Sequence, residues 1–162
     1  MAGGEGGFAP LVKEACAVAA AMSAEVARFR NCAEENLGHL EAKVTALAQQ
    51  LVRAALAQGA QGKAAAPPPV CPKCGQALSR VSAGHERTFT SRAGEIGVQR
   101  TRGYCRKCRK WRVAADTALG LTDTAGYAPS VPEMGALLVS KMPVAKASLV
   151  LAHLTGSNSV AP

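Results

Sequence analysis

The chain has 162 residues, a net charge of +8 and only six aromatic side chains, which excludes a large aromatic core. Its longest apolar run falls short of the ~18 residues that a membrane-spanning helix requires. No basic segment precedes the apolar stretch near the start, which argues against a signal peptide. We therefore expect a small α+β protein with no membrane partner and no small-molecule substrate.

An N-terminal helical segment is predicted over residues 1–57, with a disordered, Gly-rich start over residues 1–9. Pro10 suits a first helical turn, and Asn36 and Gly38 predict a break. After the break, apolar residues recur at alternating spacings of three and four. This apolar stripe consists of Leu37, Leu40, Val44, Leu47, Leu51 and Ala54. It predicts either self-association through residues 37–54 or ordinary packing in a helical bundle.

Residues 58–70 (QGAQGKAAAPPPV) predict a linker. Three consecutive prolines cannot continue a helix and favour a stiff polyproline II conformation. The linker is thus expected to separate the helical segment from the rest of the chain.

Two Cys-x-x-Cys pairs come after the linker, CPKCG and CRKC, with 30 residues between them. The x2 spacing lets one tight turn direct two thiolates at a single ion, and two such turns supply a tetrahedron of sulfurs. The pattern predicts a structural Zn²⁺ bound by Cys71, Cys74, Cys105 and Cys108 in a zinc ribbon over residues 71–115. A redox dithiol is the alternative, but no βαβ pattern surrounds either pair. Free thiols also favour a cytoplasmic protein, with Cys16 and Cys32 as small apolar residues.

Between the pairs the sequence favours strands. Residues 86–92 and 96–104 predict a hairpin that turns at residues 93–95, and residues 110–113 add a third strand. The hairpin would return the second cysteine pair to the first.

Basic charge is concentrated on the same segment. From Cys71 to Arg112 there are eleven basic residues against two glutamates, a net of +9, so the remaining residues sum to −1. Such concentration is typical of phosphate contact, although a solvated basic face is the alternative. The expected DNA contacts are Arg100, Arg102, Arg106, Lys107, Arg109, Lys110 and Arg112. Trp111 is interpreted as packing over the ribbon or, alternatively, as a platform for base stacking.

Residues 116–162 predict short helices over 131–141 and 144–154, ended by Thr155-Gly156. A small two-helix core is expected from Leu137, Leu138, Val150, Leu151 and Leu154. The pair is similar to the opening of a helix-turn-helix, whose third helix would follow Gly156.

The run from Leu40 to Gly156 resembles the N-terminal region of bacterial insertion-sequence transposases of the Kra type, a DDE family. The resemblance is carried by the Leu- and Gln-rich helix LEAKVTALAQQLVRAAL, then CPKCG, ERTFTS, AGEIGVQR, GYCRKC, DTALGL and the closing LTG. It implies the four cysteines as metal ligands and transposon-end DNA as the partner. Gly103 stands where the family has an aromatic residue, which is expected to weaken the local packing.

The resemblance also implies a catalytic domain that is absent here. DDE chemistry needs three carboxylates on a sheet to hold two metal ions, and after the cysteines only Asp116, Asp123 and Glu133 remain. We interpret Asp116 and Asp123 as turn or cap residues. The predicted function is therefore that of a non-enzymatic, DNA-binding N-terminal fragment of a transposase, truncated before its catalytic domain. A zinc-ribbon protein-interaction adaptor and a transcriptional regulator are the alternatives.

Overall fold

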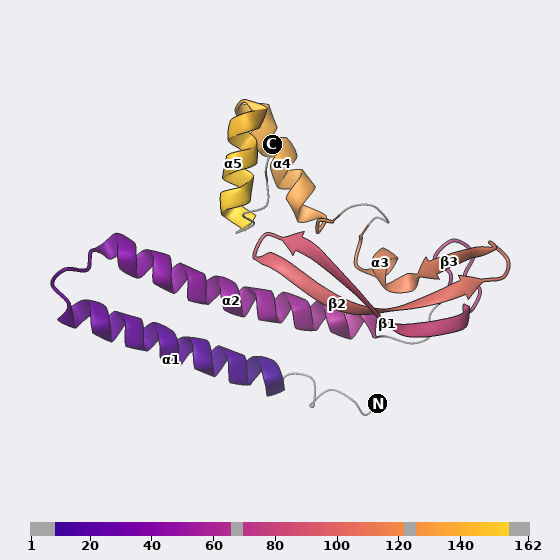
Figure 1. Cartoon of the computed structure of the whole chain (residues 1–162), viewed down its shortest axis with the longest axis horizontal. Helices are drawn as coiled ribbons and strands as arrows, with labels where there is room; N and C mark the ends of the chain where they lie inside the picture. Colours follow the sequence, from indigo (N-terminus) through magenta and orange to yellow (C-terminus); the bar gives the residue numbers. More distant parts are fainter. Residues whose placement is uncertain (1–8, 66–69, 122–125, 156–162) are drawn as a thin grey trace. The chain divides into compact units, whose positions relative to one another are not determined.

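The computed structural model describes residues 9–65, 70–121 and 126–155 (Figure 1). Within them the fold is α+β, with five helices and a three-stranded antiparallel sheet of order β1-β2-β3. The elements are α1 (Ala9–Asn31), α2 (Leu37–Ala64), β1 (Ser79–Ser91), β2 (Gly94–Cys105), β3 (Lys110–Val113), α3 (Ala114–Ala118), α4 (Ser130–Lys141) and α5 (Val144–Thr155). None of these helices combines the length and apolarity needed to cross a membrane. The chain divides into two compact units, Met1–Leu56 and Ala57–Pro162.

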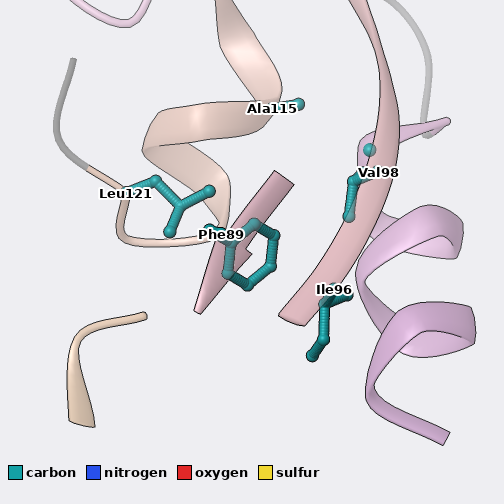
Figure 2. Packing of buried hydrophobic residues seen from close by; sticks show 6 residues of the cluster. Phe89, Ile96, Val98, Ala115 and Leu121 are labelled. Carbon is teal, nitrogen blue, oxygen red and sulfur yellow. The ribbon is translucent and has the colours of Figure 1, made fainter. Parts of the chain in front are cut away.

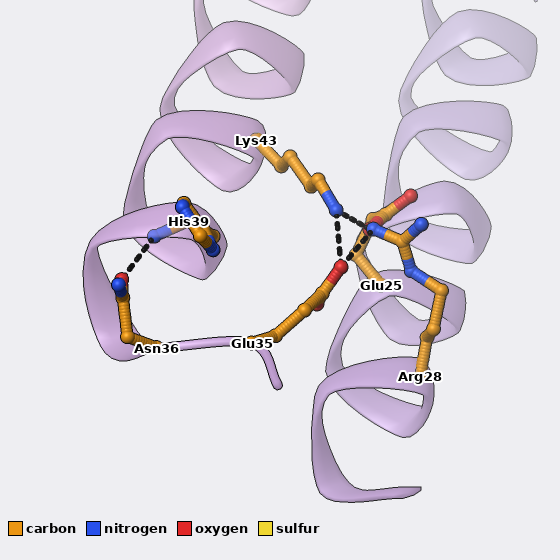
Figure 3. Close-up of polar contacts among 6 residues, drawn as sticks. All are labelled: Glu25, Arg28, Glu35, Asn36, His39 and Lys43. Atoms are coloured by element: carbon orange, nitrogen blue, oxygen red, sulfur yellow. Dashed lines mark hydrogen bonds and ion pairs between the residues drawn. The ribbon is translucent and has the colours of Figure 1, made fainter. Parts of the chain in front are cut away.

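The first unit is a helical pair whose break lies where the sequence predicts it. Asn36 precedes α2, and its side-chain Oδ1 accepts a hydrogen bond of 3.1 Å from the backbone N–H of His39 (Figure 3). Such a cap satisfies one of the N–H groups that a helix start leaves unpaired. Residues 1–8, which include most of the predicted disordered start, lie outside the described residues.

Ion pairs join the two helices beside this cap (Figure 3). Glu35 accepts from Lys43 at 2.8 Å and from Arg28 at 3.2 Å, and Arg28 also pairs with Glu25. Because these side chains are partly exposed and water screens their charges, each pair contributes little to the stability of the protein. The apolar stripe of α2 is only half-buried here, with Leu37 69% exposed, and self-association through residues 37–54 stays a prediction.

Helix α2 continues to Ala64, so the prediction that a linker begins at residue 58 is wrong for residues 58–64. Two glycines cost this stretch about 1 kcal/mol each in helix propensity, but tertiary contacts offset that cost. Ala57, Ala60 and Ala64 pack against the sheet. The Gln61 amide accepts from the backbone N–H of Gln99 at 2.8 Å and donates to its carbonyl at 3.1 Å. The proline triplet itself lies outside the described residues.

The sheet of the second unit contains the predicted hairpin, but β1 begins at Ser79 rather than at residue 86, and the turn lies at residues 92–93 rather than 93–95. β1 and β2 pair in register at Phe89 and Ile96, and the turn between Ser91 and Gly94 is closed by a 2.8 Å bond from the Ser91 hydroxyl to the Gly94 carbonyl. β3 extends over the predicted residues 110–113. The core, formed by Ala64, Phe89, Ile96, Val98, Ala115 and Leu121, lies between sheet, α3 and the end of α2 (Figure 2).

Helices α4 and α5 lie where the sequence predicts them, but the core expected between them is wrong in part. Leu137 is 63% exposed and Leu154 is 45% exposed, whereas Val131 and Ala147 are buried. Gly135 of α4 faces Leu151 of α5, because a Cβ at Gly135 would lie at a van der Waals distance of 3.7 Å from Leu151. A third helix after Gly156 would fall outside the described residues.

Gly103 does not weaken the local packing, contrary to the expectation from the family resemblance. A Cβ at this position would lie 2.6 Å from the Cβ of Leu78, and Leu78 is buried. Leu78 therefore occupies the space that a larger side chain at position 103 would need. The glycine is required for close approach of backbone and side chain.

We predict that Gly103→Ala destabilises the protein by about 1–3 kcal/mol, because Leu78 must be displaced from a packed site. The matched control is Gly62→Ala, since a Cβ there meets nothing within 4 Å. Gly62→Ala should stabilise the protein by up to about 1 kcal/mol, because alanine has a higher helix propensity than glycine at this exposed position of α2. Denaturant titration of the metal-loaded variants measures both; equal stability of Gly103→Ala and the parent chain would contradict the packing assignment.

Candidate metal centre and its basic surroundings

Two short turns place the four cysteines. Cys71 and Cys74 lie in the turn before β1, where the Cys71 N–H donates to the Gln76 carbonyl at 2.8 Å. Gly75 takes the positive φ of +71° that this turn requires. Cys105 ends β2, and the Cys108 N–H points to the Cys105 sulfur at 3.4 Å. β1 and β2 together return the second turn to the first.

The four cysteines (Cys71, Cys74, Cys105 and Cys108, the cysteine cluster) lie with their sulfurs within 4.8 Å of one another, close enough to hold one metal ion. The Cys74–Cys105 and Cys71–Cys108 sulfurs are 3.5 Å and 3.9 Å apart. Sulfurs at about 2.3 Å from a tetrahedral centre would be separated by about 3.8 Å. All four cysteines are free, and these separations are too long for disulfides. The donor set therefore fits a four-thiolate ion.

Within the cysteine cluster, the thiol of Cys71 ionises more readily than the thiol of Cys108. Burial opposes ionisation of Cys71, but backbone N–H groups of Lys73 and Cys74 and the neighbouring thiols lower its pKa to about 6. Hydrogen bonding with Cys74, together with burial and the other sulfurs, raises the pKa of Cys108 to about 12. A cation at the centre would supply the charge that allows Cys108 to ionise.

We predict that metal binding at pH 7.5 releases at least one proton, because the pKa of Cys108 is raised to about 12, whereas the pKa of Cys71 is lowered to about 6. The affinity for the metal should therefore rise with pH between 6 and 8, because protons compete with the ion for sulfur. Calorimetric titration with Zn²⁺ in two buffers of different ionisation enthalpy counts the protons. An observed enthalpy that is independent of the buffer would contradict this assignment.

The predicted DNA contacts fall into two groups. Arg106, Lys107, Arg109 and Lys110 are exposed on the turn that carries Cys108, and we call them the turn cations. Arg109 has a positive φ of +52° at the position equivalent to Gly75. Arg100, Arg102 and Arg112 lie apart from them and line a common pocket.

Arg100 is engaged by a buried carboxylate that the sequence analysis interpreted as a turn or cap residue. Its Nη1 lies 2.8 Å and 2.6 Å from the two oxygens of Asp116, and Arg87 contacts the same carboxylate at 2.9 Å. Asp116 is 5% exposed, so it bridges β1, β2 and α3 from inside the protein. Arg100 is therefore a poor partner for a duplex phosphate. No local pattern marks this role, since Arg87 and Asp116 are 29 residues apart. Asp123 lies outside the described residues.

Trp111 combines features of both interpretations offered for it. Its ring meets Tyr104 edge to face, with centroids 5.6 Å apart, which supports packing. The Arg102 guanidinium lies 4.8 Å from its ring centroid, in cation–π contact. The side chain is nevertheless 43% exposed, so part of it is accessible to a ligand.

Comparisons of the chain with protein-family models, with curated proteins and with solved structures found no match. The functional interpretation therefore depends on the cysteine cluster, the turn cations and the arginine-lined pocket.

Proposed function

We propose that the protein is a zinc-ribbon DNA-binding module, in which Zn²⁺ held by the cysteine cluster presents a basic turn to the phosphates of duplex DNA. The observation that carries the proposal is the exposure of four cations on the turn of Cys108. The sulfur separations of 3.5 Å and 3.9 Å support zinc as the ion.

An alternative explanation is that the turn cations only neutralise the negative charge of the metal centre and bind no partner. Zn²⁺ with four thiolates carries a net charge of roughly −2. The segment from Cys71 to Arg112 carries +9 before metal binding, so a large positive excess remains after that charge is subtracted. The excess favours a polyanionic partner.

The backbone at Arg109 supports the same conclusion. A left-handed conformation costs a non-glycine residue about 1–2 kcal/mol, and the equivalent position in the first turn is a glycine. A charged residue is therefore held in the second turn at the expense of stability. Such strain is common where a side chain serves a binding role.

The resemblance to transposase N-terminal regions makes transposon-end DNA the favoured target, with catalysis supplied by another domain. The competing function is that of a protein-interaction adaptor, in which helices α1 and α2 bind the partner and the sheet is a folding scaffold. The positive excess on the sheet distinguishes the two, because an adaptor of that kind has no need of it.

Zinc is tested by metal analysis of protein purified under reducing conditions. We expect one Zn²⁺ per chain, lost together with the fold of the sheet in Cys74→Ser or Cys105→Ser, because three thiolates no longer offset the ordering of a small core. Cys16→Ser is the control, since that cysteine is exposed and outside the cluster. Absence of zinc from the parent chain would overturn the metal assignment.

Duplex binding is tested by its dependence on salt. If the four turn cations each meet a phosphate, log affinity should fall with log salt at a slope of about −3.6. Replacing Arg106, Lys107 and Arg109 by Gln should reduce that slope by about 2.7 while zinc stays bound.

The matched control replaces Lys13, Arg30 and Arg53 by Gln, exposed cations on α1 and α2 that change the net charge equally. It should leave the slope unchanged to within about 0.5. Undetectable duplex binding at low salt by the zinc-loaded chain would instead favour the adaptor.

A further inference from the structure

A pocket of about 690 Å³ opens beside the sheet within the second unit. Strands β1, β2 and β3 contribute four arginines to it: Arg87, Arg100, Arg102 and Arg112. Among the described residues, Asp116 is the one carboxylate in its lining, and Trp111, His85 and Pro72 complete much of the wall. The volume lies within the range of about 300–1,000 Å³ that is typical of small-ligand sites.

Two donors of these arginines are left without partners. The Nε atoms of Arg100 and Arg112 are buried and make no hydrogen bond within the part of the chain that the structure describes. Buried charged donors are seldom left unsatisfied, because losing water without gaining a partner is costly. Both belong to arginines that line the pocket, so the guanidinium groups there are not fully satisfied by the described part of the protein.

The charge of the pocket indicates the ligand's sign. Four guanidinium groups against one carboxylate leave a net of +3 among the described residues of the lining. Asp116 accounts for one charge and holds the guanidinium groups of Arg87 and Arg100 in place. Among the described residues, no carboxylate pairs with Arg102 or Arg112, and Arg102 rests on Trp111. Guanidinium forks of this kind match the oxygens of a phosphate.

We propose that this pocket binds a terminal phosphate monoester at an end of a nucleic-acid strand. A monoester carries a charge near −2 and three acceptor oxygens, which match the arginine lining and its positive excess better than a phosphodiester does. A phosphate inside a duplex is flanked by chain on both sides and cannot enter a recess, whereas a strand end can. The assignment deepens the proposed DNA binding and rests on it for the choice of a nucleic-acid ligand.

The single tryptophan of the chain, Trp111, lines the pocket and gives a direct readout by fluorescence. The zinc-loaded protein is titrated with a short single-stranded thymidine oligonucleotide carrying a 5′-phosphate, a 3′-phosphate or neither. We expect one phosphorylated form to bind about tenfold more tightly than the unmodified form, since charge-assisted hydrogen bonds are gained. The phosphorylated oligonucleotide with the higher affinity identifies which strand end the pocket binds.

Arg112→Gln should abolish this difference, whereas Arg106→Gln, which removes an exposed charge outside the pocket, should preserve it. Inorganic phosphate should displace the phosphorylated oligonucleotide from the parent chain, which tests the site even if Arg112→Gln fails to fold. Equal affinity of all three oligonucleotides for the parent chain would overturn the proposal. The proposal would also be overturned if folded Arg112→Gln kept the full difference in affinity between the phosphorylated and the unmodified oligonucleotide. Because duplex binding is measured separately by its salt slope, failure of either assignment is distinguishable from failure of the other.

Discussion

The convergence of four sulfurs within 4.8 Å is the constraint on which the rest of the second unit depends. It joins the turn before β1 to the end of β2, so both strands must pair along their length and return to the same point. β3 then pairs with the last four residues of β2, from Arg102 to Cys105. The hydrophobic core around Phe89 is too small to specify such an arrangement alone, and small domains commonly rely on a metal for this reason.

Two kinds of positive charge result from this geometry. The turn cations project into solvent, where they exert long-range, salt-dependent attraction on a polyanion. Three of the pocket arginines, Arg87, Arg100 and Arg112, are partly buried, and Arg87 and Arg100 are oriented by Asp116. Charges of the second kind favour a particular ligand geometry, because their guanidinium planes are held in place before binding. In the proposed function, attraction and selectivity thus belong to different residues of one short segment.

Local patterns in the sequence predicted the elements of the fold well. Cys-x-x-Cys spacing predicted the cysteine cluster, and alternation in residues 86–104 predicted the hairpin, because both signals depend on near neighbours. Long-range pairing was beyond such reasoning. The bridge from Asp116 to Arg87 joins distant residues, and the helical state of residues 58–64 depends on contacts with β2 that override two glycines. Likewise, only the structure shows that Leu78 fills the space beside Gly103.

The pairing of sulfurs across the two turns also determines how the metal-free chain would respond to oxidation. The sulfurs of Cys74 and Cys105, which come from different turns, are 3.5 Å apart, so a disulfide between them would link the two turns. A bond there would close a long loop and restrict the unfolded chain. An oxidant that removes the metal would therefore exchange one cross-link of the hairpin for another, and the strands would stay joined after their ion is lost.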